Sequence, residues 1–285
     1  MSGKLFEITV EPIEQKYAAR EQQKIIDMLN DKGYHAIGIG SVGHKNEPSG
    51  DLDIAVQSNT IEELEQIVRT TFPSDESVTV ESIYIISIIH KYMTDDNEEK
   101  LVQVDFMQMV DEEYTKFRYW CPDYTNGESK YKVGHKIMLM NTILNHCIDE
   151  RFKDIESPYY AKFEYSPIGL YREIANFEDF TTKLEFVTTD VNTIMNMCSN
   201  KPSFDDFKTV ESLWGLIHSD RFKYPDEVRT MELSFFRNCD LKGWTWIKPE
   251  DFKLQYFTAD DINELLLFQK NLSSINRILQ NGREI

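Results

Sequence analysis

The stretch from residue 38 to residue 57 constrains the fold more than any other part of the chain. An apolar segment ends at the pair Gly40 and Ser41, and a polar loop follows it. Next comes a run in which Asp51 and Asp53 alternate with apolar residues. Since alternate side chains of a strand share a face, both carboxylates are predicted on one face and the apolar residues between them on the core face. Neighbouring carboxylates are costly to bury unless a cation compensates their charge.

A third acidic residue repeats this pattern later in the chain. Asp105 is the only acidic residue in the apolar run 101–109. Its parity places it on the face opposite the valines and the phenylalanine of that run. If the two strands are neighbours in one sheet, Asp105 joins Asp51 and Asp53 in a cluster of three carboxylates. Such a set of oxygen ligands suits one or two Mg²⁺ ions.

The first part of the chain predicts an α+β fold, with a small mixed β-sheet packed on helices. Helical periodicity covers residues 13–31, and Thr60 is a suitable N-cap for a second helix. Strand patterns occupy residues 34–40, 51–57, 78–92 and 101–109. The polar stretch between the last two strands predicts a hairpin turn.

The rest of the chain predicts a mostly α-helical domain. We divide the chain into domains of residues 1–120 and 121–285. Helices are predicted at residues 135–152, 168–178, 187–198, 205–219, 225–237 and 259–281. The aromatic cluster of Tyr159, Tyr160, Phe163 and Tyr165 is predicted to lie in a loop.

The motifs together resemble the nucleotidyltransferase superfamily that includes DNA polymerase β, the CCA-adding enzymes, poly(A) polymerases and antibiotic adenylyltransferases. The resemblance covers roughly residues 13–110. It rests on Ile39-Gly40-Ser41, Asp51-Leu52-Asp53-Ile54 and Val104-Asp105-Phe106. Many members carry Ser or Thr directly before the first aspartate, where this chain has Gly50, with Ser49 one position earlier.

The resemblance implies a polymerase β-like core and transfer of a nucleoside monophosphate from an NTP such as ATP to a hydroxyl group, with release of pyrophosphate. Asp51 and Asp53 would hold two Mg²⁺ ions, for which Mn²⁺ can substitute. Asp105 would ligate the second metal and accept the proton of the hydroxyl group.

The resemblance also implies a set of nucleotide-binding residues. Gly40 would let the backbone approach the phosphates, and Ser41 would donate a hydrogen bond to the β- or γ-phosphate. Lys45, in the loop after the Gly-Ser pair, is a candidate for contact with phosphate. Lys136, near the start of the helix that follows the sheet, would help to hold the triphosphate.

The net charge of −18 disfavours binding of long duplex nucleic acid, which needs a basic surface. The acceptor stays open among an RNA 3′ end, a protein side chain and a small molecule. A toxin-like or defence enzyme would share this chemistry and differ in its acceptor. The alternative from another class is a non-catalytic nucleotide-binding or regulatory protein on the same scaffold.

Location and cysteine chemistry follow from composition. No apolar run reaches the length of a membrane span, and the N-terminus lacks the apolar core of a signal peptide, so we expect a cytoplasmic protein without a membrane partner. The four cysteines are widely spaced, which predicts buried thiols rather than a zinc site.

Overall fold

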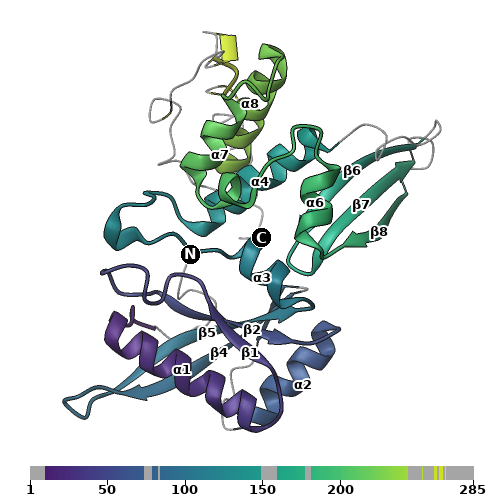
Figure 1. Ribbon diagram of the computed structural model, residues 1–285. Coiled ribbons are helices and arrows are strands. Elements are labelled where there is room, and N and C mark those ends of the chain that lie inside the picture. The colour runs from purple at the N-terminus through teal and green to yellow at the C-terminus, as the bar shows by residue number, and fades with distance from the viewer. Residues whose placement is uncertain are drawn as a thin grey trace, which may run out of the picture. The chain divides into compact units, whose positions relative to one another are not determined.

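The structure is a computed structural model, and it forms two compact units (Figure 1). It describes residues 10–73, 79–82, 84–148, 159–176, 181–242, 252, 260–261, 263–265 and 267. One unit is formed by Met1–Val133 and Ile155–Asn196, and the other by Gly134–Asp154 and Met197–Ile285. The described residues contain helices and two small sheets, so the predicted α+β class is confirmed. The domain boundary at residue 120 stays a prediction.

The larger sheet carries the acidic motifs. Its strand order is β1-β2-β5-β4-β3. The strands are β1 (Ala36–Ile39), β2 (Asp51–Gln57), β3 (Thr79–Ser82), β4 (Ile85–Met93) and β5 (Glu99–Met109). β2 and β5 are parallel, whereas the other pairs are antiparallel. The prediction that the two acid-bearing strands are neighbours is therefore confirmed, as is the hairpin between β4 and β5.

Two helices cover the apolar face of this sheet. α1 (Gln15–Asp31) packs on β1 and β2, and α2 (Ile61–Thr71) packs on β4 and β5 (Figure 1). The β2 residues that point at these helices, Leu52, Ile54 and Val56, are fully buried, as their parity predicts. The Thr60 side chain accepts a hydrogen bond from the backbone N–H of Glu63 at 3.2 Å, which confirms the predicted cap.

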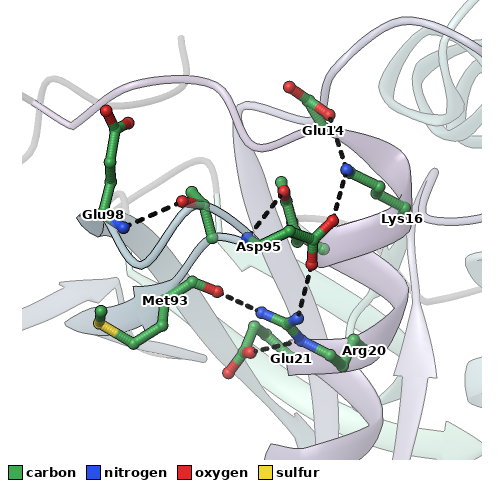
Figure 2. A network of polar contacts seen from close by, with 9 residues as sticks. Glu14, Lys16, Arg20, Glu21, Met93, Asp95 and Glu98 are labelled. Atoms are coloured by element: carbon green, nitrogen blue, oxygen red, sulfur yellow. Dashed lines mark hydrogen bonds and ion pairs between the residues drawn. The ribbon is translucent and has the colours of Figure 1, made fainter.

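A network of exposed polar contacts joins α1 to the hairpin of β4 and β5 (Figure 2). Lys16 Nζ lies 2.8 Å from Asp95 Oδ2, and Arg20 Nη1 lies 3.8 Å from Asp95 Oδ1. Exposed ion pairs of this kind contribute about 0–1 kcal/mol each. Beneath them, the buried rings of Tyr17 and Tyr92 pack with centroids 5.9 Å apart. Most of the docking energy is therefore expected from the aromatic contact.

The second sheet corrects three predictions. Its strands β6 (Tyr159–Ser166), β7 (Gly169–Asn176) and β8 (Thr182–Thr188) are antiparallel, in that order. The prediction of a loop around Tyr159 and the prediction of a helix at 168–178 are therefore wrong. The prediction of a mostly α-helical second half is wrong for residues 159–166, 169–176 and 182–188, which form this sheet. In β6, buried Phe163 and Tyr165 alternate with exposed polar residues, which is the two-residue period of a strand.

A short helix connects the two sheets within the first unit. α3 (Glu112–Arg118) lies where the sequence predicts only the end of the first domain. The Tyr114 hydroxyl donates to the Ser166 carbonyl at 2.6 Å, and the rings of Tyr114 and Tyr165 lie 5.3 Å apart. Arg118 also donates to the Tyr165 carbonyl. These buried contacts hold β6 against α3.

The second unit is helical in its described residues. The remaining helices that the structure describes are α4 (Val133–Cys147), α6 (Val191–Met197), α7 (Val210–Ile217) and α8 (Pro225–Leu241), with short 3₁₀ turns η1 (Tyr124–Asn126) and η2 (Phe204–Phe207). Of these, η1 and nearly all of α6 belong to the first unit. Trp214 of α7 packs against Phe235 and Phe236 of α8, with centroids 6.0 Å apart in both pairs. Helix 259–281 falls mostly outside the described residues. All four cysteines are buried and none forms a disulfide with another, as predicted.

Candidate functional site

The three predicted aspartates lie on adjacent strands. In the parallel pair of β2 and β5, Asp53 is the direct partner of Asp105, and Asp51 is the partner of Gln103. Neighbouring strands are about 4.8 Å apart. All four side chains share the sheet face opposite α1 and α2, because they occupy alternate positions of strands whose other face is core. The structure thus brings Asp51, Asp53 and Asp105 together.

Asp105 is the most enclosed of the three. Its side chain is 7% exposed, while Asp51 and Asp53 are half-buried. Ser87 Oγ donates to Asp105 Oδ1 at 2.8 Å, and so does Gln103 Nε2 at 2.8 Å. Ser87 is the partner of Asp105 on β4. Two donors on one oxygen, one from β4 and one from β5 itself, fix the orientation of this carboxylate.

Gly40 lies directly against Asp53. Its φ of +80° is in the left-handed region, which favours glycine. A Cβ atom at Gly40 would lie 2.2 Å from Asp53 Oδ2, well inside van der Waals contact. The Gln22 side chain of α1 donates to the Asp53 carbonyl at 2.9 Å and to the Ile39 carbonyl at 3.3 Å. The positive φ of the turn and the close approach of the Asp53 side chain therefore both require glycine at position 40.

One glutamine organises the loop between the Gly-Ser pair and β2. Gln15, at the start of α1, accepts from the Gly43 backbone N–H at 2.9 Å. It donates to the Glu47 carbonyl at 2.8 Å and to Ser49 Oγ at 3.0 Å. Ser49 is buried and bridges Ile13 through two backbone hydrogen bonds. Ser49, two residues before Asp51, therefore helps to hold this loop in place.

Two lysines interact electrostatically with Asp51. Burial raises the pKa of the Asp51 carboxyl above its ordinary value, while the charges of Lys45 and Lys132 act to lower it. Lys45 was predicted near the site. Lys132 was missed, because it is distant in sequence and belongs to no motif. The raised pKa means that the two lysines compensate the buried charge incompletely.

The other predicted nucleotide-binding residues have different surroundings. Ser41 is half-buried in the turn after Gly40. Lys136 lies on α4, in the second compact unit, and is almost fully buried. Its contact with a triphosphate stays a prediction. Gln103 was placed on the correct face by strand parity, but nothing in its residue type marked it as a partner of Asp105.

The donor atoms suit a hard cation in kind. Within the described residues, no group of three or more His, Cys, Asp or Glu side chains is arranged to hold a metal ion as it stands. The same face nevertheless carries three carboxylates and the Gln103 carbonyl oxygen, which is buried and has no hydrogen-bond partner in the part of the chain that the structure describes. Mg²⁺ prefers oxygen ligands of this type. A bound cation would require the carboxylates to turn toward one another.

A cleft of about 230 Å³ runs along β1 beside Gly40. It is lined by residues that include Gln22, His44, Lys116, Tyr119 and Trp120. Trp120 is 38% exposed, so an aromatic face is accessible to a ligand there. This cleft offers stacking and hydrogen-bonding groups next to the turn.

No family model matches the sequence, and no curated protein matches it either. In the part of the chain that the structure describes, no helix is long and apolar enough to cross a membrane.

Proposed function

We propose that this protein is a metal-dependent nucleotidyltransferase with a polymerase β-like core. One observation carries the proposal: Asp53 and Asp105 are direct partners on adjacent parallel strands, with Asp51 on the same face. The Gly40 turn packed against Asp53 adds support, because it leaves backbone next to the carboxylates where a phosphate chain would lie.

The three carboxylates would bind Mg²⁺, with Mn²⁺ as a substitute. When bound, the metal would stabilise charge on the attacking and leaving oxygens of the transferred phosphoryl group. Asp105 is already oriented by Ser87 and Gln103, so it needs little rearrangement to act as a ligand and as the acceptor of the hydroxyl proton.

The chain itself would hold the triphosphate. Ser41 would donate a hydrogen bond to a phosphate oxygen, and Lys45 would contribute positive charge beside it. Lys132 joins this proposal on the strength of its charge interaction with Asp51. Lys136 would add a further cation. The acceptor is proposed to be a hydroxyl of an RNA end, a protein side chain or a small molecule.

A transfer assay with labelled substrate tests this function. The protein is incubated with Mg²⁺, a cell extract and each α-³²P-labelled NTP in turn, and label is followed into RNA, protein and small-molecule fractions. We expect labelling by the wild type and none by the variant Asp51→Asn with Asp53→Asn. Asp31→Asn, an exposed change at the end of α1, makes the same kind of charge change outside the site and should label normally.

The outcomes separate the candidate functions. Equal labelling by the wild type and the double variant would refute the assignment of the aspartates. Binding of NTP without transfer to any fraction would favour the alternative of a non-catalytic nucleotide-binding protein. The fraction that receives label would identify the class of acceptor.

A further inference from the structure

Gln103, beside the three aspartates, uses the nitrogen of its side-chain amide, but not the oxygen, for a hydrogen bond within the described ranges. Gln103 is 3% exposed and lies opposite Asp51 on the neighbouring strand. Its Nε2 donates to Asp105 Oδ1, so its Oε1 points away from that carboxylate. This oxygen is buried and has no hydrogen-bond partner among the described residues. Leaving such an atom unpaired is energetically unfavourable.

The orientation of the amide follows from chemistry. An ionised carboxylate oxygen accepts hydrogen bonds only, so the NH₂ group of Gln103, and not its carbonyl oxygen, must face Asp105. The carbonyl oxygen is therefore committed to the carboxylate-bearing face of the sheet. A buried acceptor held in one orientation beside carboxylates is the arrangement expected of a ligand to a cation, or to a water bound to one.

We propose that Gln103 is the fourth oxygen donor of the metal centre and the residue that positions Asp105 for the metal. Its amide nitrogen holds Asp105, and its carbonyl oxygen contacts the divalent cation or a water of that cation. The inference rests on the proposed metal-dependent function, because it assigns a role at the same centre. It adds a neutral ligand to three charged ones, which increases the number of ligands without increasing their mutual repulsion.

The alternative is that Gln103 merely packs in the sheet and orients Asp105. Three substitutions distinguish these roles. Gln103→Met removes both the hydrogen bond to Asp105 and the carbonyl oxygen. Ser87→Ala removes one hydrogen bond to the same Asp105 oxygen and leaves the carbonyl oxygen in place. Gln108→Met makes the identical change at another buried glutamine of β5, on the opposite face, where the amide donates to the Ser58 carbonyl.

Metal affinity is the measurement, since it does not depend on turnover. The full chain is titrated with Mn²⁺, and free Mn²⁺ is followed by electron paramagnetic resonance. Loss of a residue that supports a metal ligand typically weakens affinity about 10- to 100-fold. We expect a loss in this range for Gln103→Met, a smaller loss for Ser87→Ala, and a change within about threefold for Gln108→Met. Unfolding curves measured in parallel show whether each variant is folded.

Each result decides one point. If Gln103→Met binds Mn²⁺ as well as Gln108→Met does, the role of Gln103 is refuted while the metal centre stands. If the wild type does not bind Mn²⁺, the metal centre itself is refuted. Should Gln103→Met fail to fold, Gln103→Leu removes the same hydrogen bond and the same carbonyl oxygen and is expected to show the same loss of Mn²⁺ affinity, about 10- to 100-fold. Wild-type affinity in a folded Gln103→Leu would overturn the proposal.

Discussion

Replacing Gly40 by alanine is the sharpest test of the site, because two separate costs meet at one position. The φ of +80° costs an alanine about 1–2 kcal/mol in backbone strain. In addition, the new Cβ would lie 2.2 Å from Asp53 Oδ2, so the carboxylate must rotate or the turn must shift. The first cost affects only the free energy of unfolding. The second also moves a proposed metal ligand.

Gly43 and Gly33 allow the two costs to be separated. Gly43 has a φ of +78° and Gly33 has a φ of +86°, but a Cβ atom at either would have nothing within 4 Å. Gly43→Ala and Gly33→Ala should therefore each lose about 1–2 kcal/mol of unfolding free energy and keep Mn²⁺ affinity. Gly40→Ala should lose at least as much stability, and its Mn²⁺ affinity and transfer rate should fall about 10-fold or more, because a ligand displaced by even a fraction of an ångström loses alignment.

Urea unfolding followed by circular dichroism gives the stability of each variant, and Mn²⁺ titration gives the state of the site. Equal behaviour of Gly40→Ala and Gly43→Ala in both measurements would mean that the contact with Asp53 has no consequence for the site. The geometry on which the proposed function depends would then be refuted, whatever the value of the shared stability loss.

Two further substitutions test the stability of the two compact units, one substitution in each. Thr60→Ala removes the cap of α2 and should lower the free energy of unfolding by about 1 kcal/mol, measured by urea unfolding against Thr60→Ser, which retains the hydroxyl. In the second unit, burial lowers the pKa of His218, but hydrogen bonds to the Glu232 carboxylate and the Trp214 carbonyl outweigh it and raise the pKa above 6.5. A raised pKa stabilises the fold fully below the ordinary histidine value and loses that contribution as the pH rises through the folded value. His218→Gln should therefore cost more unfolding free energy at about pH 6 than at about pH 9, and a cost that does not fall with pH would contradict a protonated His218.

The parts of the fold that the sequence predicts are those in which one local period decides the outcome. β2 has the bounds 51–57 predicted for it, because a charged face and an apolar face alternate there without exception up to Ile54. The caps and apolar stripe of α2 are similarly local. β6 has the same two-residue period in Phe163 and Tyr165, and its aromatic residues favour a strand, but the period spans few residues and its polar positions carry no motif.

What the sequence does not predict depends on contacts between distant segments. Ser87 faces Asp105 only because β4 returns beside β5 in one particular register. Lys132 interacts with Asp51 although the residues between them form most of the sheet. Strand parity puts Gln103 on the same face as Asp105. A glutamine on a strand attracts attention only once the structure shows that its amide nitrogen has a hydrogen-bond partner and its carbonyl oxygen has none among the described residues.

The electrostatics of this sheet face support the proposal of a bound cation. Burial raises the pKa of Asp51 despite Lys45 and Lys132, so the fold bears a cost there that its own side chains do not offset. Asp105 is held by neutral donors, which orient it without supplying positive charge. The unpaired Gln103 oxygen adds a second cost at the same place. Substituting apolar residues would remove both costs, so their presence together on one sheet face supports the proposed metal site. A divalent cation would offset both costs, because it would compensate the charge of the carboxylates and give the amide oxygen a partner.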